Sequence, residues 1–144
     1  MYYLWRENFD DKNIKLSRLY MTKVQELESK QLADAIVEGI QEKKGKNITV
    51  LDLTDVENTI TNYFVICNGD SNTHVDAVAD SVEDYVREKL KEKPYHVEGR
   101  ENAQWILLDY LDVVVHVFQR SVRDFYNLES LWSDAKRTDV PALF

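Results

Sequence analysis

Four apolar residues recur at helical spacing near the start of the chain: Leu32, Ala35, Ile36 and Ile40. Positions i, i+3, i+4 and i+8 lie on one face of a helix with 3.6 residues per turn. Ser29 can cap the start of this helix, and Gly45 can adopt the left-handed conformation that ends one. The pattern therefore predicts a helix over residues 29–44.

Apolar runs of a different period follow this helix. Ile48–Leu53 is rich in β-branched residues and predicts a strand. Tyr63–Cys67 is apolar at successive positions, which is typical of a central strand covered on both faces. Turn residues come next, and a second apolar stripe predicts a helix from about Thr73 to Lys91, ending before Pro94.

The apolar patterns in the second half of the chain predict three more strands and a helix. A short strand is expected at Tyr95–Glu98, and the runs Gln104–Asp109 and Val113–Phe118 should form a tight hairpin, since three residues separate them. Ser121-x-x-Asp124 resembles a capping box that starts a last helix reaching Trp132. From Ser133 onwards the pattern fades, and we expect an irregular tail. The element order α-β-β-α-β-β-β-α predicts an α/β (α+β) fold, a mixed sheet with helical cover.

Alternation in the first hairpin strand separates two sets of side chains. Trp105, Leu107 and Asp109 share one face, and the opposite face carries Ile106, Leu108 and Tyr110. Because Ile106 and Leu108 form the more conventional core pair, the first set can point towards a partner, and a buried tryptophan anchor contributes about 2–4 kcal/mol at an interface. The alternative is that helices cover both faces and Trp105 is a core residue. Periodicity does not decide between the two.

Residues 1–20 carry aromatic side chains without a clear period, and Met21 resembles a natural start. Two interpretations remain open. The segment is a leader or flexible arm separate from a single domain at 21–144, or it is an arm whose Trp5 and Phe9 pack on that domain.

Composition restricts the partners and the compartment. The 144 residues suit one domain, and the net charge of -8 disfavours non-specific nucleic-acid binding, which needs clustered Lys and Arg. An acidic body is instead steered towards a basic protein. A single cysteine excludes an internal disulfide and fits a reducing compartment. With no 18-residue apolar span and no signal-peptide pattern, we expect a cytoplasmic protein that is not bound to a membrane.

Four carboxylates are the strongest catalytic candidates: Asp52, Asp55, Asp109 and Asp112. Carboxylates on strands and turns can hold magnesium for phosphoryl chemistry, but the D-x-D pair on one strand face is missing. The turn 68–71 faintly resembles a phosphate loop and is better explained as a turn with a helix cap. The sequence therefore favours a protein that is not an enzyme and predicts no cofactor.

The histidines and the cysteine give no reactive cluster. His116 lies between valines and is interpreted as a core or edge residue with one hydrogen bond. His74 and His96 have no second ligand at helix or strand spacing, so no metal site is expected. Cys67 lies in an apolar run, where burial makes a thiol inert.

Six segments in order resemble the ribosomal silencing factors, also called the Iojap-related family. These are Asp52-Leu-Thr, Ile60-Thr-Asn-Tyr-Phe-Val-Ile-Cys-Asn-Gly69 with Ser71, Val97-Glu-Gly99, Trp105-Ile-Leu-Leu-Asp109, Asp112-Val-Val-Val-His116-Val-Phe118 and Arg123-Asp-Phe-Tyr126-Asn-Leu-Glu129-x-Leu-Trp132. The resemblance runs from about Leu32 to Trp132. It departs at Tyr110-Leu111, where the family usually has Leu-Gly, and at Asn62, where it usually has Asp. The segment before Met21 has no counterpart in the family pattern.

This resemblance implies a nucleotidyltransferase-like sandwich without the catalytic site. It also implies a translation repressor that binds the large ribosomal subunit through ribosomal protein fourteen and sterically blocks joining of the small subunit. The expected partner-binding residues are Trp105, Leu107, Asp109, Tyr110 and Asp112. Two alternatives stay open. One is a magnesium-dependent nucleotidyltransferase-like enzyme using Asp52, Asp55 and Asp109, and the other is a homodimer that pairs a strand edge or the Trp105 face.

Overall fold

Six strands form one mixed sheet in the computed structural model of the protein, which describes residues 2–143 and the side chains of residues 12–143. The strands are β1 (Lys46–Asp52), β2 (Tyr63–Gly69), β3 (His96–Glu98), β4 (Trp105–Asp109), β5 (Val113–Gln119) and β6 (Lys136–Asp139). Their order across the sheet is β3-β4-β5-β2-β1-β6. Only β2 and β5 pair in parallel among these strands. The predicted α/β fold with a mixed sheet is confirmed.

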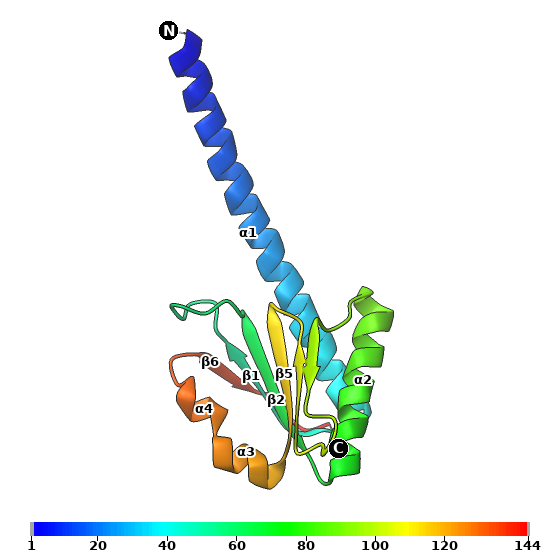
Figure 1. Ribbon diagram of the computed structural model, residues 1–144. Coiled ribbons are helices and arrows are strands. Elements are labelled where there is room, and N and C mark those ends of the chain that lie inside the picture. Colours follow the sequence, from blue (N-terminus) through cyan, green and yellow to red (C-terminus); the bar gives the residue numbers. More distant parts are fainter. Residues whose placement is uncertain (1, 144) are drawn as a thin grey trace.

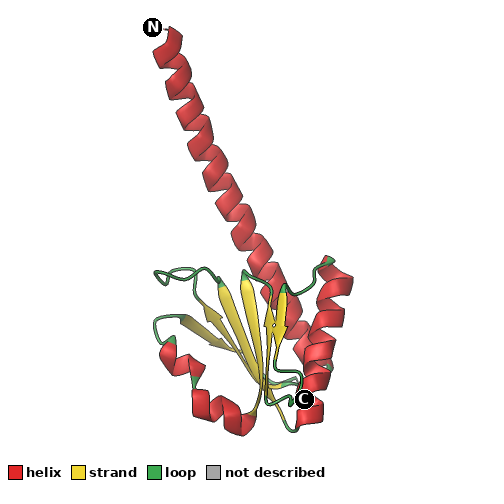
Figure 2. Ribbon diagram, viewed as in Figure 1, coloured by secondary structure: helices red, strands yellow, loops and turns green. Residues whose placement is uncertain are grey.

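Helices cover the two faces of the sheet unequally. The helices α1 (Tyr2–Glu42) and α2 (Asn72–Leu90) pack side by side on one face, whereas the short helices α3 (Arg120–Tyr126) and α4 (Leu128–Leu131) lie towards the other (Figures 1 and 2). The main apolar core fills the space between the sheet and the α1–α2 pair. A smaller cluster on the opposite face is centred on Leu51, Ile66 and Phe118.

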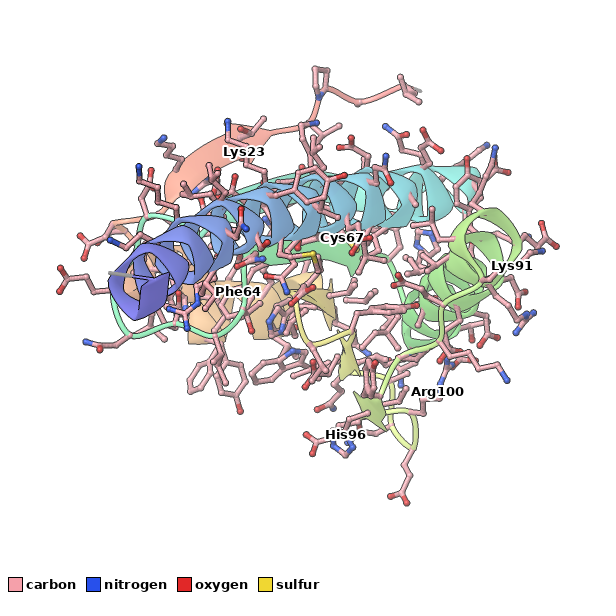
Figure 3. All side chains as sticks on the ribbon, turned by 90° about the horizontal axis from the view of Figure 1, so that it is seen from above. Lys23, Phe64, Cys67, Lys91, His96 and Arg100 are labelled. Atoms are coloured by element: carbon pink, nitrogen blue, oxygen red, sulfur yellow. The ribbon has the colours of Figure 1, made fainter. Side chains whose placement is uncertain are left out.

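The strand β2 lies near the middle of the sheet, as its apolar run predicts. It pairs with β5 on one side and with β1 on the other, and Val65, Ile66 and Cys67 are fully buried. Cys67 lies between α1 and the sheet (Figure 3), where burial raises the pKa of its thiol to about 12. The interpretation of Cys67 as an inert core thiol is confirmed.

The helix α1 begins far earlier than the predicted residue 29. It is continuous from Tyr2, and its N-terminal half projects well beyond the sheet (Figure 1). Ser29 therefore cannot be a helix cap. It is buried instead, and its hydroxyl accepts a hydrogen bond from the Asn62 side-chain amide at 2.9 Å. Trp5 and Phe9 lie outside the residues whose side chains the structure describes.

The left-handed residue that ends α1 is not the predicted one. Lys44, with φ of 58°, takes the left-handed conformation that the sequence assigned to Gly45. Gly45 serves another purpose, because a Cβ atom there would lie 2.3 Å from Cγ2 of Ile40. The glycine is thus required for close packing of the chain as it leaves the helix, and the left-handed prediction for it is wrong.

The helix α2 matches its predicted range. Ser71 is the N-cap, and its hydroxyl accepts a hydrogen bond from the backbone N–H of His74 at 3.1 Å. This confirms the interpretation of residues 68–71 as a turn with a helix cap. Beyond α2, Arg100 donates to Asp76, Asp80 and Glu83 and so ties the β3–β4 loop to the helix.

The C-terminal region corrects two predictions. The Ser121 capping box does not form, since α3 begins at Arg120 without a side-chain cap, and Asn127, with φ of 48°, separates α3 from α4. The tail is not irregular either, because residues 136–139 form β6 along the edge of β1. The residues of β6 are all exposed and polar, so its pairing rests on backbone hydrogen bonds and on the bond that the Thr49 hydroxyl donates to Asp139 at 2.8 Å, which no apolar pattern reveals.

Candidate protein-binding face

The strand β4 presents two chemically different faces, as alternation predicts. Ile106 and Leu108 are fully buried in the main core, whereas Trp105, Leu107 and Asp109 are half-buried on the opposite side. The short helices α3 and α4 shield part of that side and leave the rest open. Trp105 therefore packs against the smaller apolar cluster without being fully buried, and its contact with a partner stays a prediction.

Aromatic rings form a continuous row across this face. Ring centroids are separated by 5.2 Å between Phe125 and Tyr126, by 4.7 Å between Tyr126 and Trp105, and by 5.6 Å between Phe64 and Trp132. His116 lies between the two halves of the row, with its ring 5.8 Å from Trp105 and 5.0 Å from Phe64. We call the face formed by these residues and Leu107 the aromatic face. Phe125 is 81% exposed, so the row reaches from the core into solvent.

His116 fixes the orientation of the tryptophan. The indole Nε1–H of Trp105 donates to Nδ1 of His116 at 3.1 Å. Burial lowers the pKa of His116 to about 4, so the ring is neutral and can accept this bond at neutral pH. Its Nε2 has no partner among the described residues. The interpretation of His116 as a core residue with one hydrogen bond is confirmed.

Asp109 shapes the hairpin between β4 and β5. Its Oδ1 accepts a hydrogen bond from the backbone N–H of Leu111 at 2.8 Å, and the N–H of Asp112 donates to the carbonyl of Tyr110 at 3.0 Å. The φ of Leu111 is 71°, which with this i to i+2 bond is the geometry of a strained γ-turn. The chain thus has a leucine with positive φ at the position where the family pattern usually has glycine.

The remaining two predicted residues lie apart from the aromatic face. Tyr110 is only 4% exposed and packs into the main core, where burial raises the pKa of its phenol. The side chain of Asp112 is exposed at the hairpin, and its backbone carbonyl accepts hydrogen bonds from the N–H groups of Asn62 and Tyr63. The structure therefore brings together Trp105, Leu107 and Asp109 on one side of β4, and it leaves Asp112 in the adjoining hairpin turn and Tyr110 in the core.

A buried arginine, Arg123, connects α3 and α4 to the sheet on the same side as the aromatic face. The sequence analysis did not predict this role. The guanidinium of Arg123 donates to Glu129 at 2.9 and 2.7 Å, to Asn68 at 3.1 Å and to Thr49 at 3.0 Å. It also donates to the carbonyl of Asn47. These bonds join α3 and the start of α4 to β1 and β2. The detectable signal was a charged residue within the apolar pattern of the last helix, six positions before a glutamate.

The carboxylates considered for catalysis do not converge. Two strands, β5 and β2, separate Asp109 on β4 from Asp52 on β1, which is about 14 Å at the usual strand spacing. Asp55 pairs with Lys136 at 3.2 Å, and Asp52 accepts hydrogen bonds from Thr54. Across the described residues, no three His, Cys, Asp or Glu side chains form a group that could hold a metal ion.

A mixed sheet with one face covered by long helices and a second face lined by aromatic side chains places the protein in the α/β class. Comparison with known proteins identifies the family. The sequence model described as ribosomal silencing factor during starvation matches residues 26–143, and the chain belongs to that family. The N-terminal half of α1, up to residue 25, lies outside the match.

Individual relatives support this assignment. The chain is 39% identical over 100 residues to the ribosomal silencing factor RsfS of Bacillus subtilis, covering 69% of this chain and 82% of the relative. It is 37% identical over 81 residues to the chloroplastic protein Iojap of Zea mays, covering 56% of this chain and 35% of the relative. A crystal structure of a Chromobacterium violaceum protein, 34% identical, superposes with a TM-score of 0.68 and covers 79% of this chain and 94% of that one. The resemblance drawn from the sequence motifs is confirmed.

Proposed function

We propose that the protein represses translation by binding ribosomal protein fourteen of the large subunit through its aromatic face, which blocks joining of the small subunit. Membership of the ribosomal silencing factor family supports a ribosome-associated regulator of translation. The observation that supports this particular surface is the continuous aromatic row, which α3 and α4 leave partly uncovered.

The aromatic face combines the two features that protein interfaces favour. Trp105 and Leu107 provide apolar area that is half-buried already, so docking orders few free side chains. Asp109 at the end of β4 and the exposed Asp112 in the adjoining hairpin add negative charge beside the face, and the whole chain carries a net charge of -8. A basic ribosomal protein matches this charge, whereas bare RNA phosphate is repelled.

Repression by steric exclusion of the small subunit needs no catalysis. A domain of this length measures about 30 Å or more across. Such a body bound at the surface between the subunits excludes the second subunit, provided that it binds more tightly than that subunit at working concentrations. No described helix is long and apolar enough to cross a bilayer. We also propose that the protein acts in the cytoplasm, which suits a family whose members are named as ribosomal silencing factors.

Co-sedimentation with purified large subunits tests the surface. Trp105→Ala removes the anchor and should weaken binding by about 2–4 kcal/mol, which is 30-fold or more. Asp109→Lys should also weaken binding, but this change breaks the turn bond to Leu111 as well. Asp109→Asn keeps an acceptor for that bond and removes only the charge. Glu88→Lys on α2 is the matched control, because it reverses an exposed charge on the opposite side of the sheet.

Loss of binding in the two aromatic-face variants, with Asp109→Asn intermediate and Glu88→Lys unchanged, is the expected outcome. Wild-type binding by both Trp105→Ala and Asp109→Lys means that another surface contacts the subunit. A sucrose-gradient assay of subunit joining tests the consequence. Added protein should reduce the joined particles, and its recovery on intact joined particles contradicts occlusion.

A further inference from the structure

The N-terminal half of α1 contains a positively charged segment within an acidic chain. Residues 12–25 hold four basic side chains and no acidic one: Lys12, Lys15, Arg18 and Lys23. Residues 1–11 hold one basic and three acidic side chains, and residues 26–42 hold one basic and five acidic ones. The net charge of -8 for the whole chain therefore conceals one local segment of opposite sign.

The four basic side chains of this segment lie on one side of the helix. At about 100° per residue they fall within an arc of roughly 140°, and they extend over about 16 Å of the helix axis. All four residues are exposed, and among the described residues none of them forms an ion pair. We call the side formed by Lys12, Lys15, Arg18 and Lys23 the basic face.

The basic face lies away from the acidic body of the domain. The helix leaves the sheet near Ser29, whose partner Asn62 donates its backbone N–H to Asp112 of the β4–β5 hairpin, and the rest of α1 projects beyond this edge (Figure 1). At 1.5 Å per residue, Arg18 and Lys12 lie about 16 Å and 25 Å along the helix from Ser29. The Debye length is about 8–10 Å at physiological salt, so the charge of the body is largely screened at these positions.

The apolar residues of the same segment favour RNA over a membrane as the partner. Leu16, Leu19 and Tyr20 lie beside the basic face, whereas Ile14 and Met21 lie roughly opposite them, so α1 has no single apolar face. A helix that lies on a bilayer needs such a face opposite its charged one. Phosphate groups need only clustered, exposed Lys and Arg, which displace their counterions.

We propose that the basic face of α1 binds the phosphate backbone of RNA, as a contact separate from the aromatic face. Its four charges can neutralise about four phosphates, and contacts of this kind carry no sequence specificity. Membership of the ribosomal silencing factor family makes RNA the nucleic acid at hand. That this RNA belongs to the large subunit rests on the proposed function, in which a domain held at a ribosomal protein brings its projecting helix against the surrounding RNA.

Fluorescence anisotropy of a labelled RNA duplex, titrated with the full chain, tests the proposal. The logarithm of the wild-type binding constant should fall against the logarithm of salt concentration with a slope of about -3 to -4, as four phosphate contacts require. Lys15→Gln with Arg18→Gln removes two contacts and should halve this slope. Lys15→Arg with Arg18→Lys keeps both charges and should bind like the wild type. Circular dichroism should show that all variants keep the wild-type helix content.

Lys43→Gln with Lys93→Gln is the matched control. It removes the same net charge from two exposed residues of the domain, neither of which forms an ion pair within the part of the chain that the structure describes. This control should keep the wild-type slope. Trp105→Ala leaves α1 unchanged and should also bind the duplex like the wild type, which separates this contact from that of the aromatic face.

Three results overturn the proposal. Failure of the wild type to bind the duplex at about 50 mM salt, where phosphate contacts are strong, excludes the contact. Equal loss of binding in the two glutamine double variants assigns the effect to net charge and not to the basic face. Binding to vesicles of anionic phospholipid without binding to the duplex assigns the basic face to a membrane surface. None of these results bears on the aromatic face, which co-sedimentation of Trp105→Ala with large subunits tests independently.

Discussion

The buried side chain of His116 makes the free energy of unfolding depend on pH. The substitution His116→Asn separates this contribution from that of the other ionisable groups. Burial lowers the pKa of His116 to about 4, from 6.5 when it is exposed. Between these values the unfolded chain binds a proton and the folded protein does not. The free energy of unfolding therefore falls as pH drops from 7, and the loss is complete below the folded pKa.

The magnitude follows from the two pKa values. Moving from pH 7 to pH 5 should remove about 2 kcal/mol of stability through His116, rising to roughly 3 kcal/mol below pH 4. The variant His116→Asn cannot titrate and still offers an oxygen acceptor to the indole of Trp105. Its own stability at pH 7 is expected to be lower, but only its change with pH enters the comparison.

Urea denaturation at pH 7 and pH 5 measures the effect. All other ionisable groups are common to the two proteins, so their contributions cancel in the difference of differences. The wild type should lose about 2 kcal/mol more than His116→Asn between the two pH values. Equal losses would show that His116 is accessible to protons in the folded state, which refutes its role as a neutral, buried support for Trp105.

Three further substitutions test individual parts of the structure. Leu111→Gly should raise the free energy of unfolding by roughly 0.5–1 kcal/mol, because a positive φ costs a leucine about 1–2 kcal/mol and glycine returns part of this as chain entropy; urea denaturation checks it, and a destabilised variant contradicts it. Arg123→Gln should lower stability by about 3–5 kcal/mol, since Glu129, with a side chain only 10% exposed, loses its charged partner; unchanged thermal unfolding would disprove this. Gly99→Ala should destabilise the β3–β4 loop, because a Cβ would lie 1.9 Å from the carbonyl oxygen of Trp105; amide hydrogen exchange in that loop would reveal faster opening, and wild-type exchange would count against it.

Local patterns predicted the parts of the fold that apolar burial determines. Three elements could be predicted because each covers one continuous core: the alternating strand Trp105–Asp109, the buried strand β2 and the helix α2 with its apolar stripe. The helix cap at Ser71 could also be predicted, since its side chain accepts a hydrogen bond from within the first turn of its own helix.

The missed features depend on contacts that no local period encodes. The strand β6 is polar throughout and is held by its pairing with β1. The early start of α1 was not predicted, because the apolar residues of its exposed half do not continue the stripe that packs on the sheet. The bonds of Arg123 reach Thr49 and Asn68, which are distant in sequence. The openness of the aromatic face depended on how far α3 and α4 extend over it.

The parallel pairing of β2 with β5 has a consequence for how the chain is made. Tyr63 aligns with Val113, fifty residues later, so the centre of the sheet cannot close until nearly the whole domain has left the ribosome that synthesises it. During that interval the run Tyr63–Cys67 presents an unpaired apolar edge, which is the form in which strands aggregate. A nascent copy is therefore most vulnerable while its last third is still being translated, and its yield should depend on holdase chaperones that shield this edge.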